Sequence, residues 1–311
     1  MIATQQKTTL MLEEKAFLRT LLYFDIFHYP LTEKEIEKYA PCSVAVPTAE
    51  ILSQLINQNL IFKTGGFYSI QKNSDLSARR TDGNKLAEQR LITAKKYSRV
   101  IARFPFVRAV LLSGSISKGF MDERSDIDYF IITAPNRLWI ARSALVLFRR
   151  IFLFNSRKNF CTNYFIDTDN LTIPDQNYFT SIECCTLLPM YGAEYIQRFH
   201  FSNQWVKSFL PVCQSQGILT SDSNFFTKSL FEKILSGKAF TKLNSHLMNS
   251  TLKYWKRKYA ASMDQKDFDI AFRSKPGVSR SHPQFFQKKV LDRLSQKIKE
   301  FESQHGIDLT I

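Results

Sequence analysis

Two aspartates that stand two residues apart open an apolar run in the middle of the chain. Asp126 and Asp128 flank Ile127 and are followed by Tyr-Phe-Ile-Ile, a run typical of a buried strand. Residues i and i+2 of a strand share a face, so both carboxylates are expected to point the same way. Adjacent carboxylates repel each other unless a cation lies between them, and Mg²⁺ is commonly held by one or two carboxylates together with substrate phosphates. The pair therefore predicts a divalent-cation site.

A Gly-Ser turn lies ten residues before this pair. The apolar run 107–112 leads into Gly114 and Ser115. Glycine allows the backbone to approach a ligand closely, so the amides and the hydroxyl of this turn can hold a phosphate beside the cation. These are the parts of metal-assisted phosphoryl transfer. Lys118 fits two interpretations equally, a ligand of a triphosphate or a solvated loop lysine.

The two segments together resemble a known family. SGSISKG at 113–119 followed by SDID at 125–128 is similar to the signature of nucleotidyltransferases of the DNA polymerase beta superfamily. The resemblance implies that Asp126 and Asp128 hold divalent ions, Mg²⁺ or Mn²⁺. It implies that Gly114, Ser115 and Lys118 bind the triphosphate of an NTP, with ATP as the expected donor. The reaction would transfer a nucleoside monophosphate to an acceptor hydroxyl and release pyrophosphate.

Members of that superfamily complete the acidic set with a third carboxylate on a later strand, which helps to activate the attacking hydroxyl. Asp167, at the end of the run 163–167, is the first candidate, and Asp169 and Glu183 are alternatives. An alternative interpretation is that Asp167 is a strand-end aspartate that starts a turn. Because members without a working third carboxylate are inactive, the alternative function is a catalytically weak or inactive regulator that senses nucleotides or binds DNA.

The residues before this motif predict the order helix, helix, helix, hairpin. Apolar residues recur at helical spacing in 14–28, and Thr32 with Glu35 forms a capping-box pattern before a second helix. A third helix is expected over 47–58, and Gly65-Gly66 marks a hairpin turn. This order resembles a winged helix-turn-helix. The third helix has no Lys or Arg, whereas DNA readers gain much of their affinity from basic contacts to phosphates, so we favour protein packing or dimerisation over DNA binding.

The wider layout is similar to that of uncharacterised bacterial proteins in which a winged helix precedes such a transferase domain. The stretches that carry this broader resemblance are 104–119, 161–173 and 201–211. It implies the same activity and names no substrate.

The rest of the chain completes an expected α+β fold. The polar segment 73–83 is read as a linker, helices are expected over 84–103 and 138–154, and a surface loop is expected around 275–283. The resulting domains are a winged-helix module at 1–72, a transferase domain at 73–223 and a basic helical region at 224–311. The middle domain is expected to be a small mixed sheet with helices on one side.

The net charge of +15 is unevenly distributed along the 311 residues. The three predicted domains carry 0, +6 and +9 in chain order. Such a field suits phosphate-bearing partners, or it is an ordinary basic surface. The charge distribution does not distinguish among a small molecule, an RNA and a protein as the acceptor.

Cysteine usage and hydropathy predict a cytoplasmic protein without a membrane partner. The five cysteines form no CxxC motif and no zinc-type cluster, and are read as buried reduced thiols. The most apolar stretch, 138–154, is interrupted by three arginines and is too short and too charged to span a membrane. The first residues lack the apolar core of a signal peptide.

Overall fold

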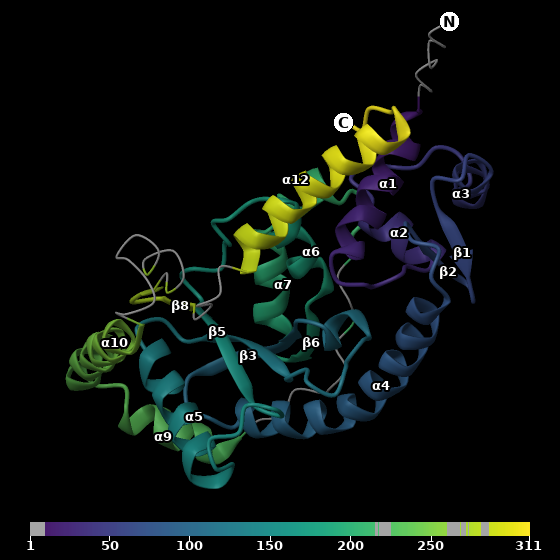
Figure 1. Ribbon diagram of the computed structural model, residues 1–311. Coiled ribbons are helices and arrows are strands. Elements are labelled where there is room, and N and C mark those ends of the chain that lie inside the picture. The colour runs from purple at the N-terminus through teal and green to yellow at the C-terminus, as the bar shows by residue number, and fades with distance from the viewer. Residues whose placement is uncertain are drawn as a thin grey trace, which may run out of the picture.

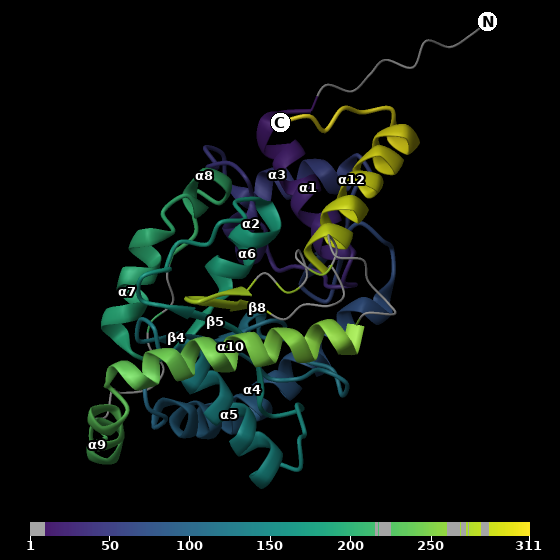
Figure 2. The same cartoon turned by 90° about the vertical axis from the view of Figure 1, so that its left-hand side faces the viewer.

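A mixed sheet lies between two layers of helices in the computed structural model of the chain (Figures 1 and 2). The structure describes residues 10–214, 217, 225–259, 268, 272, 274–280 and 286–311. The predicted mixture of helices with a mixed sheet is confirmed, and the fold is α+β.

The N-terminal residues form the predicted order of three helices and a hairpin. These elements are α1 (Leu12–Asp25), α2 (Glu33–Tyr39), α3 (Thr48–Asn57), β1 (Phe62–Thr64) and β2 (Phe67–Ser69). The capping box at α2 is present, because the Glu35 amide donates to Thr32 Oγ1 over 3.3 Å and the Thr32 amide donates to Glu35 Oε2 over 2.9 Å. A single bridge between Leu31 and Tyr68 ties the hairpin to the segment before α2.

The sheet has six strands within the described residues, in the order β6-β3-β4-β5-β8-β7. They are β3 (Val107–Ser113), β4 (Asp128–Thr133), β5 (Cys161–Asp167), β6 (Leu188–Tyr191), β7 (Ser274–Lys275) and β8 (Val278–Arg280). β4 and β5 are parallel, and the other neighbouring pairs are antiparallel. The strands predicted over 107–112 and from Tyr129 are thereby confirmed.

Helices cover both faces of the sheet, so the prediction of helices on one side is wrong. On one face, α6 (Tyr178–Thr186), α7 (Ala193–Ser202) and the N-terminal helices share an apolar cluster with β4. On the other face, α4 (Ser74–Ala102) and α5 (Leu138–Phe152) pack against alternate residues of the same strands. The physical reason lies in the centres of β3 and β4. Residues 109–112 and 129–132 are continuous apolar runs and not alternating ones, as in strands buried on both faces.

The predicted linker 73–83 is the first part of α4, which is a single helix. Asn73 caps it by accepting a 2.9 Å hydrogen bond from the Asp75 amide. The segment is polar because much of this long helix faces water. One exception is Arg80, which is buried, forms a 2.7 Å ion pair with Glu35 and lies over the Tyr29 ring. Arg80 therefore fastens α4 to the N-terminal module.

The last third of the chain is not purely helical. It contains α9 (Phe226–Ile234), α10 (Lys238–Tyr259) and α12 (Phe286–His305), but also the β7–β8 hairpin. Residues 275–280, predicted as part of a surface loop, lie in this hairpin and extend the sheet because β8 pairs with β5. Residues 281–283 of that loop lie outside the described residues. α12 runs alongside α1 (Figure 1), where Lys297 forms an ion pair with Asp25.

Two cysteines depart from the prediction of reduced thiols. Cys185 on α6 and Cys213, after α8 (Val206–Phe209), are paired in a disulfide with Cα atoms 5.9 Å apart. They are 28 residues apart in the chain, so no short motif signals the pairing. Among the described residues, Cys42, Cys161 and Cys184 are free and buried, as predicted.

The helix predicted over 138–154 is α5, which packs one side against the sheet and leaves residues such as Leu147 and Ile151 exposed. None of the helices in the described part of the chain combines the length and apolar character that a membrane span requires.

Candidate active site

The turn after β3 lies directly beside the first residue of β4. The strand register places Ser113 opposite Asp128. Gly114 has a φ of +70°, and a Cβ there would lie 2.8 Å from Asp128 Oδ2. A side chain at position 114 would therefore collide with the carboxylate. The fold thus brings the Gly-Ser turn next to Asp128, as the sequence predicts.

Asp128 is hydrogen-bonded to Asn163 on β5, a residue that was not predicted to belong to the site. Asn163 Nδ2 donates to Asp128 Oδ1 over 2.8 Å, and Asn163 Oδ1 accepts from the Cys161 thiol over 3.2 Å. A polar residue inside the apolar run 161–167 is a signal that could have indicated this contact. Burial, together with the charges of Asp126 and Glu183, raises the pKa of Asp128 to about 6.

Asp126 precedes the strand and does not lie on it. β4 begins at Asp128, so the expectation that both aspartates alternate on one strand holds only for the second. Asp126 is half-buried, and its charge raises the pKa of Asp128. The two carboxylates therefore interact electrostatically.

Lys118 faces the same site and is not a solvated loop residue. Its side chain is 13% exposed, and Nζ donates to Gly114 O over 3.2 Å and to Glu183 Oε1 over 2.9 Å. It belongs to the short 3₁₀ turn η1 (Ile116–Lys118). Tyr29, which follows α1, donates its hydroxyl to the Lys118 carbonyl over 2.6 Å. The N-terminal module thus holds the turn that carries Lys118.

The structure does not bring Asp167 to this site. β4 and β5 are parallel, with Asp128 beside Cys161 and Asp167 beside Thr133. Five residues of strand span about 17 Å, so Asp167 lies at the opposite end of the sheet. Its carboxylate accepts hydrogen bonds from the Asn170 side chain (2.7 Å) and the Asp169 amide (3.2 Å), as a strand-end aspartate that starts a turn does. Asp169 is exposed in the same turn.

Glu183 is the third carboxylate that reaches the site. It comes from α6, not from a strand, and both its ion pair with Lys118 and its effect on the pKa of Asp128 place it there. The sequence offers it only as an alternative, because nothing in the segment 178–186 shows which face of the helix turns toward Asp128.

Most of these groups line a cavity of about 530 Å³, although Asp126 is not among its lining residues. One wall consists of Ser113, Gly114, Ser115, Lys118, Asp128, Asn163 and Glu183. Aromatic rings make up much of the rest, and they include Tyr23, Phe24, Phe27, Tyr29, Phe179 and Phe286. Four of these six rings belong to the N-terminal module, so that module forms part of the candidate site.

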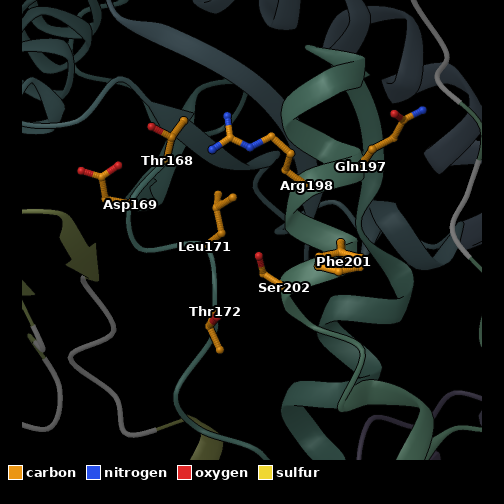
Figure 3. A pocket seen from close by; sticks show the side chains of 8 residues that line it. All are labelled: Thr168, Asp169, Leu171, Thr172, Gln197, Arg198, Phe201 and Ser202. Atoms are coloured by element: carbon orange, nitrogen blue, oxygen red, sulfur yellow. The ribbon is translucent and has the colours of Figure 1, made fainter.

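A second hollow lies beyond the end of β5, between the turn 168–172 and α7 (Figure 3). Its volume is about 540 Å³, and Asp169 and Arg198 are the ionisable groups among its eight lining residues. Arg198 extends from α7 toward Thr168 (Figure 3). The hollow contains no residue of the Gly-Ser turn or the aspartate pair, so it is a separate feature.

The residues present fit a cation that is shared with a substrate phosphate. In the described part of the chain, no three His, Cys, Asp or Glu side chains come together as a set that could hold a metal ion by themselves. Two interacting carboxylates beside a backbone turn are, however, the protein share of a typical Mg²⁺ site, in which phosphates and water supply the other ligands.

Comparisons of the chain with protein-family models, with curated proteins and with solved structures found no match.

Proposed function

We propose that the protein is a metal-dependent nucleotidyltransferase that moves a nucleoside monophosphate from an NTP, with ATP first, to an acceptor hydroxyl and releases pyrophosphate. The observation that carries the proposal is the contact between the Gly114 turn and Asp128, with Asp126, Lys118 and Glu183 around them. The resemblance of 113–128 to the DNA polymerase beta superfamily supports it, as does the cavity that Gly114, Lys118, Asp128 and Glu183 line.

Asp126 and Asp128 would hold the divalent cation, Mg²⁺ or Mn²⁺. When bound, the cation would neutralise phosphate charge and polarise the α-phosphoryl group. Asn163 holds the Asp128 carboxylate by a hydrogen bond, so this ligand is oriented before substrate arrives. The amides of Gly114 and Ser115 and the Ser115 hydroxyl would bind the triphosphate.

The ion pair between Lys118 and Glu183 would break when an NTP binds. In the structure they neutralise each other at 2.9 Å. A triphosphate carries more negative charge than one carboxylate, so it would attract the Lys118 ammonium and release Glu183. Glu183 would then accept the proton of the acceptor hydroxyl as that oxygen bonds to the α-phosphorus and the bond to pyrophosphate breaks.

The N-terminal segment fits a winged helix that packs against the transferase domain. Exposed residues of α3 include Glu50 and Ser53, and α3 has no Lys or Arg, so it lacks the basic surface of a DNA reader. The cytoplasmic location and the absence of a membrane partner stay predictions from the sequence.

Calorimetry with ATP, GTP, CTP and UTP, each with Mg²⁺, tests the proposal. We expect the wild type to bind one NTP or more only when Mg²⁺ is present, and an Asp126→Asn/Asp128→Asn variant to bind at least roughly 10-fold more weakly. Asp169→Asn, at the opposite end of the sheet, is the matched control and should bind like the wild type. A double variant that binds as tightly as the wild type would overturn the proposal. A folded wild type that binds no NTP would also overturn it and would favour a regulator that binds DNA.

A further inference from the structure

Three phenylalanines from distant parts of the chain meet in the wall of the candidate site. Phe27 follows α1, Phe179 lies on α6 and Phe286 is the first residue of α12. The Phe286 ring centroid is 6.1 Å from that of Phe27 and 5.9 Å from that of Phe179, with interplanar angles of 36° and 68°. All three side chains line the 530 Å³ cavity. We call them the aromatic trio.

The aromatic trio retains a surface that a ligand could cover. Phe286 is 47% exposed although it contacts two rings, and Phe27 is half-buried. Leaving apolar ring surface in water costs about 25 cal/mol per Å², and a group that stacked on these rings would recover part of that cost. Because the rings also line the cavity, a flat group inside it could pack against an exposed ring face or edge.

One ion pair in the cavity wall, beside the first turn of α12, is already neutralised. Arg280 donates to Asp175 Oδ2 over 2.7 Å and to the side-chain oxygen of Gln287, the next residue on α12, over 2.9 Å. An ionised ligand group would have to break this pairing, whereas an uncharged ring would not. The local chemistry therefore favours a flat, uncharged aromatic ring.

We propose that the aromatic trio is a stacking subsite for a flat, uncharged ring that belongs to a ligand of this cavity. The subsite goes beyond the proposed transfer reaction. Only the identity of the molecule that supplies the ring rests on that proposed function. The ring is either the base of the donor nucleotide or an aromatic part of the acceptor. In both cases the N-terminal module and α12 take part in ligand recognition.

The subsite can be tested with a small fluorescent probe, 4-methylumbelliferone, which is flat and is uncharged in slightly acidic buffer. We expect it to bind the full chain and to bind Phe286→Ala roughly 5- to 10-fold more weakly, because about 1 kcal/mol of ring contact is lost. Phe201→Ala is the matched control, since Phe201 is 75% exposed on α7 and lies outside the cavity. Phe286→Tyr should bind the probe like the wild type. Equal melting temperatures would show that Phe286→Ala remains folded.

Competition then identifies the source of the ring. Displacement of the probe by Mg·ATP but not by Mg·tripolyphosphate assigns the subsite to the nucleobase, and displacement by neither assigns it to the acceptor. Displacement by tripolyphosphate, no binding to the wild type, or equal binding to Phe286→Ala would overturn the subsite. Probe binding needs neither metal nor nucleotide, so the subsite can stand where Mg·ATP fails to bind in calorimetry, and that failure would count against the transfer reaction alone.

Discussion

The surroundings of Asp128 disfavour the ionised form of its carboxyl group. Its carboxylate is half-buried beside a backbone turn and accepts a hydrogen bond from Asn163. Desolvation, together with the charges of Asp126 and Glu183, raises its pKa from 3.8 to about 6. A raised carboxyl pKa means that the folded protein holds a proton more tightly than the unfolded chain does. The contribution of Asp128 to stability is therefore complete below pH 3.8 and is lost as the pH rises through about 6.

The Asp128→Asn variant should be more stable than the wild type in metal-free buffer at neutral pH. Each pKa unit corresponds to about 1.4 kcal/mol, so the gain in unfolding free energy is at most roughly 3 kcal/mol, and it should vanish near pH 4. Urea unfolding with a chelator present, at both pH values, measures this difference. If Asp128→Asn is less stable than the wild type at neutral pH, the ionised carboxylate is not penalised and this account of Asp128 is wrong.

Sequence could predict the residues of the site that are close together in the chain. Gly114, Ser115, Lys118 and the two aspartates all lie within one strand–turn–strand unit, whose local order fixes their neighbours. The third carboxylate is different, because α6 reaches Asp128 only through tertiary packing. A family pattern that places this group on a strand led to Asp167, which the parallel register puts at the wrong end of β5.

At the scale of elements, Gly83 shows why the local sequence does not predict the first part of α4. A glycine in a polar segment indicates a linker, but Gly83 lies within the helix, and a Cβ there would lie 2.1 Å from the Phe120 ring. That ring is packed edge-on against Tyr29 and lies beneath Arg79, so it cannot easily move away. The glycine is required by a contact between elements, which the local sequence does not reveal.

Gly83→Ala should therefore destabilise the protein. In an unobstructed helix this change stabilises by about 1 kcal/mol, whereas here overpacking against Phe120 should cost about 1–3 kcal/mol. The sign should reverse in a Phe120→Ala background, where the added methyl group has space. Chemical denaturation of the four proteins in this double-mutant cycle gives both values. Stabilisation by Gly83→Ala alone would contradict the contact.

The β7–β8 hairpin is not predictable from the local sequence, for a related reason. Ser274–Arg280 is a Ser/Pro/Gly-containing segment with two very short strands, and its pairing with β5 is formed with residues more than 100 positions away. Periodicity cannot detect strands of two or three residues. The long apolar runs of β3 and β4 and the amphipathic α5 were, by contrast, predictable from local pattern alone.

Across the whole molecule, the predicted domains share a core. One apolar cluster includes Phe17 of α1, Phe199 of α7 and Leu294 of α12, which belong to the three different predicted segments. The ion pair of buried Arg80 with half-buried Glu35 adds a polar link between α4 and the N-terminal module. We infer that the segments stabilise one another.

Unfolding should accordingly be a single cooperative transition. All three tryptophans lie outside residues 1–72, so fluorescence reports the rest of the chain while far-ultraviolet circular dichroism also reports α1–α3. The two urea transitions should coincide. Arg80→Met, which leaves Glu35 without its partner, should shift both together by about 3 kcal/mol. An earlier transition seen by circular dichroism alone would show that the N-terminal module unfolds independently.

The central claim is that Asp126 and Asp128 share a divalent cation with a triphosphate held at the Gly114 turn. The most direct measurement is the anomalous diffraction of crystals grown with Mn²⁺ and a non-hydrolysable ATP analogue. We expect a manganese peak in contact with both carboxylates and with phosphate oxygens, and the phosphates within hydrogen-bond distance of the Gly114 and Ser115 amides. Analogue bound elsewhere, or no manganese at the two aspartates with the analogue in place, would contradict the account.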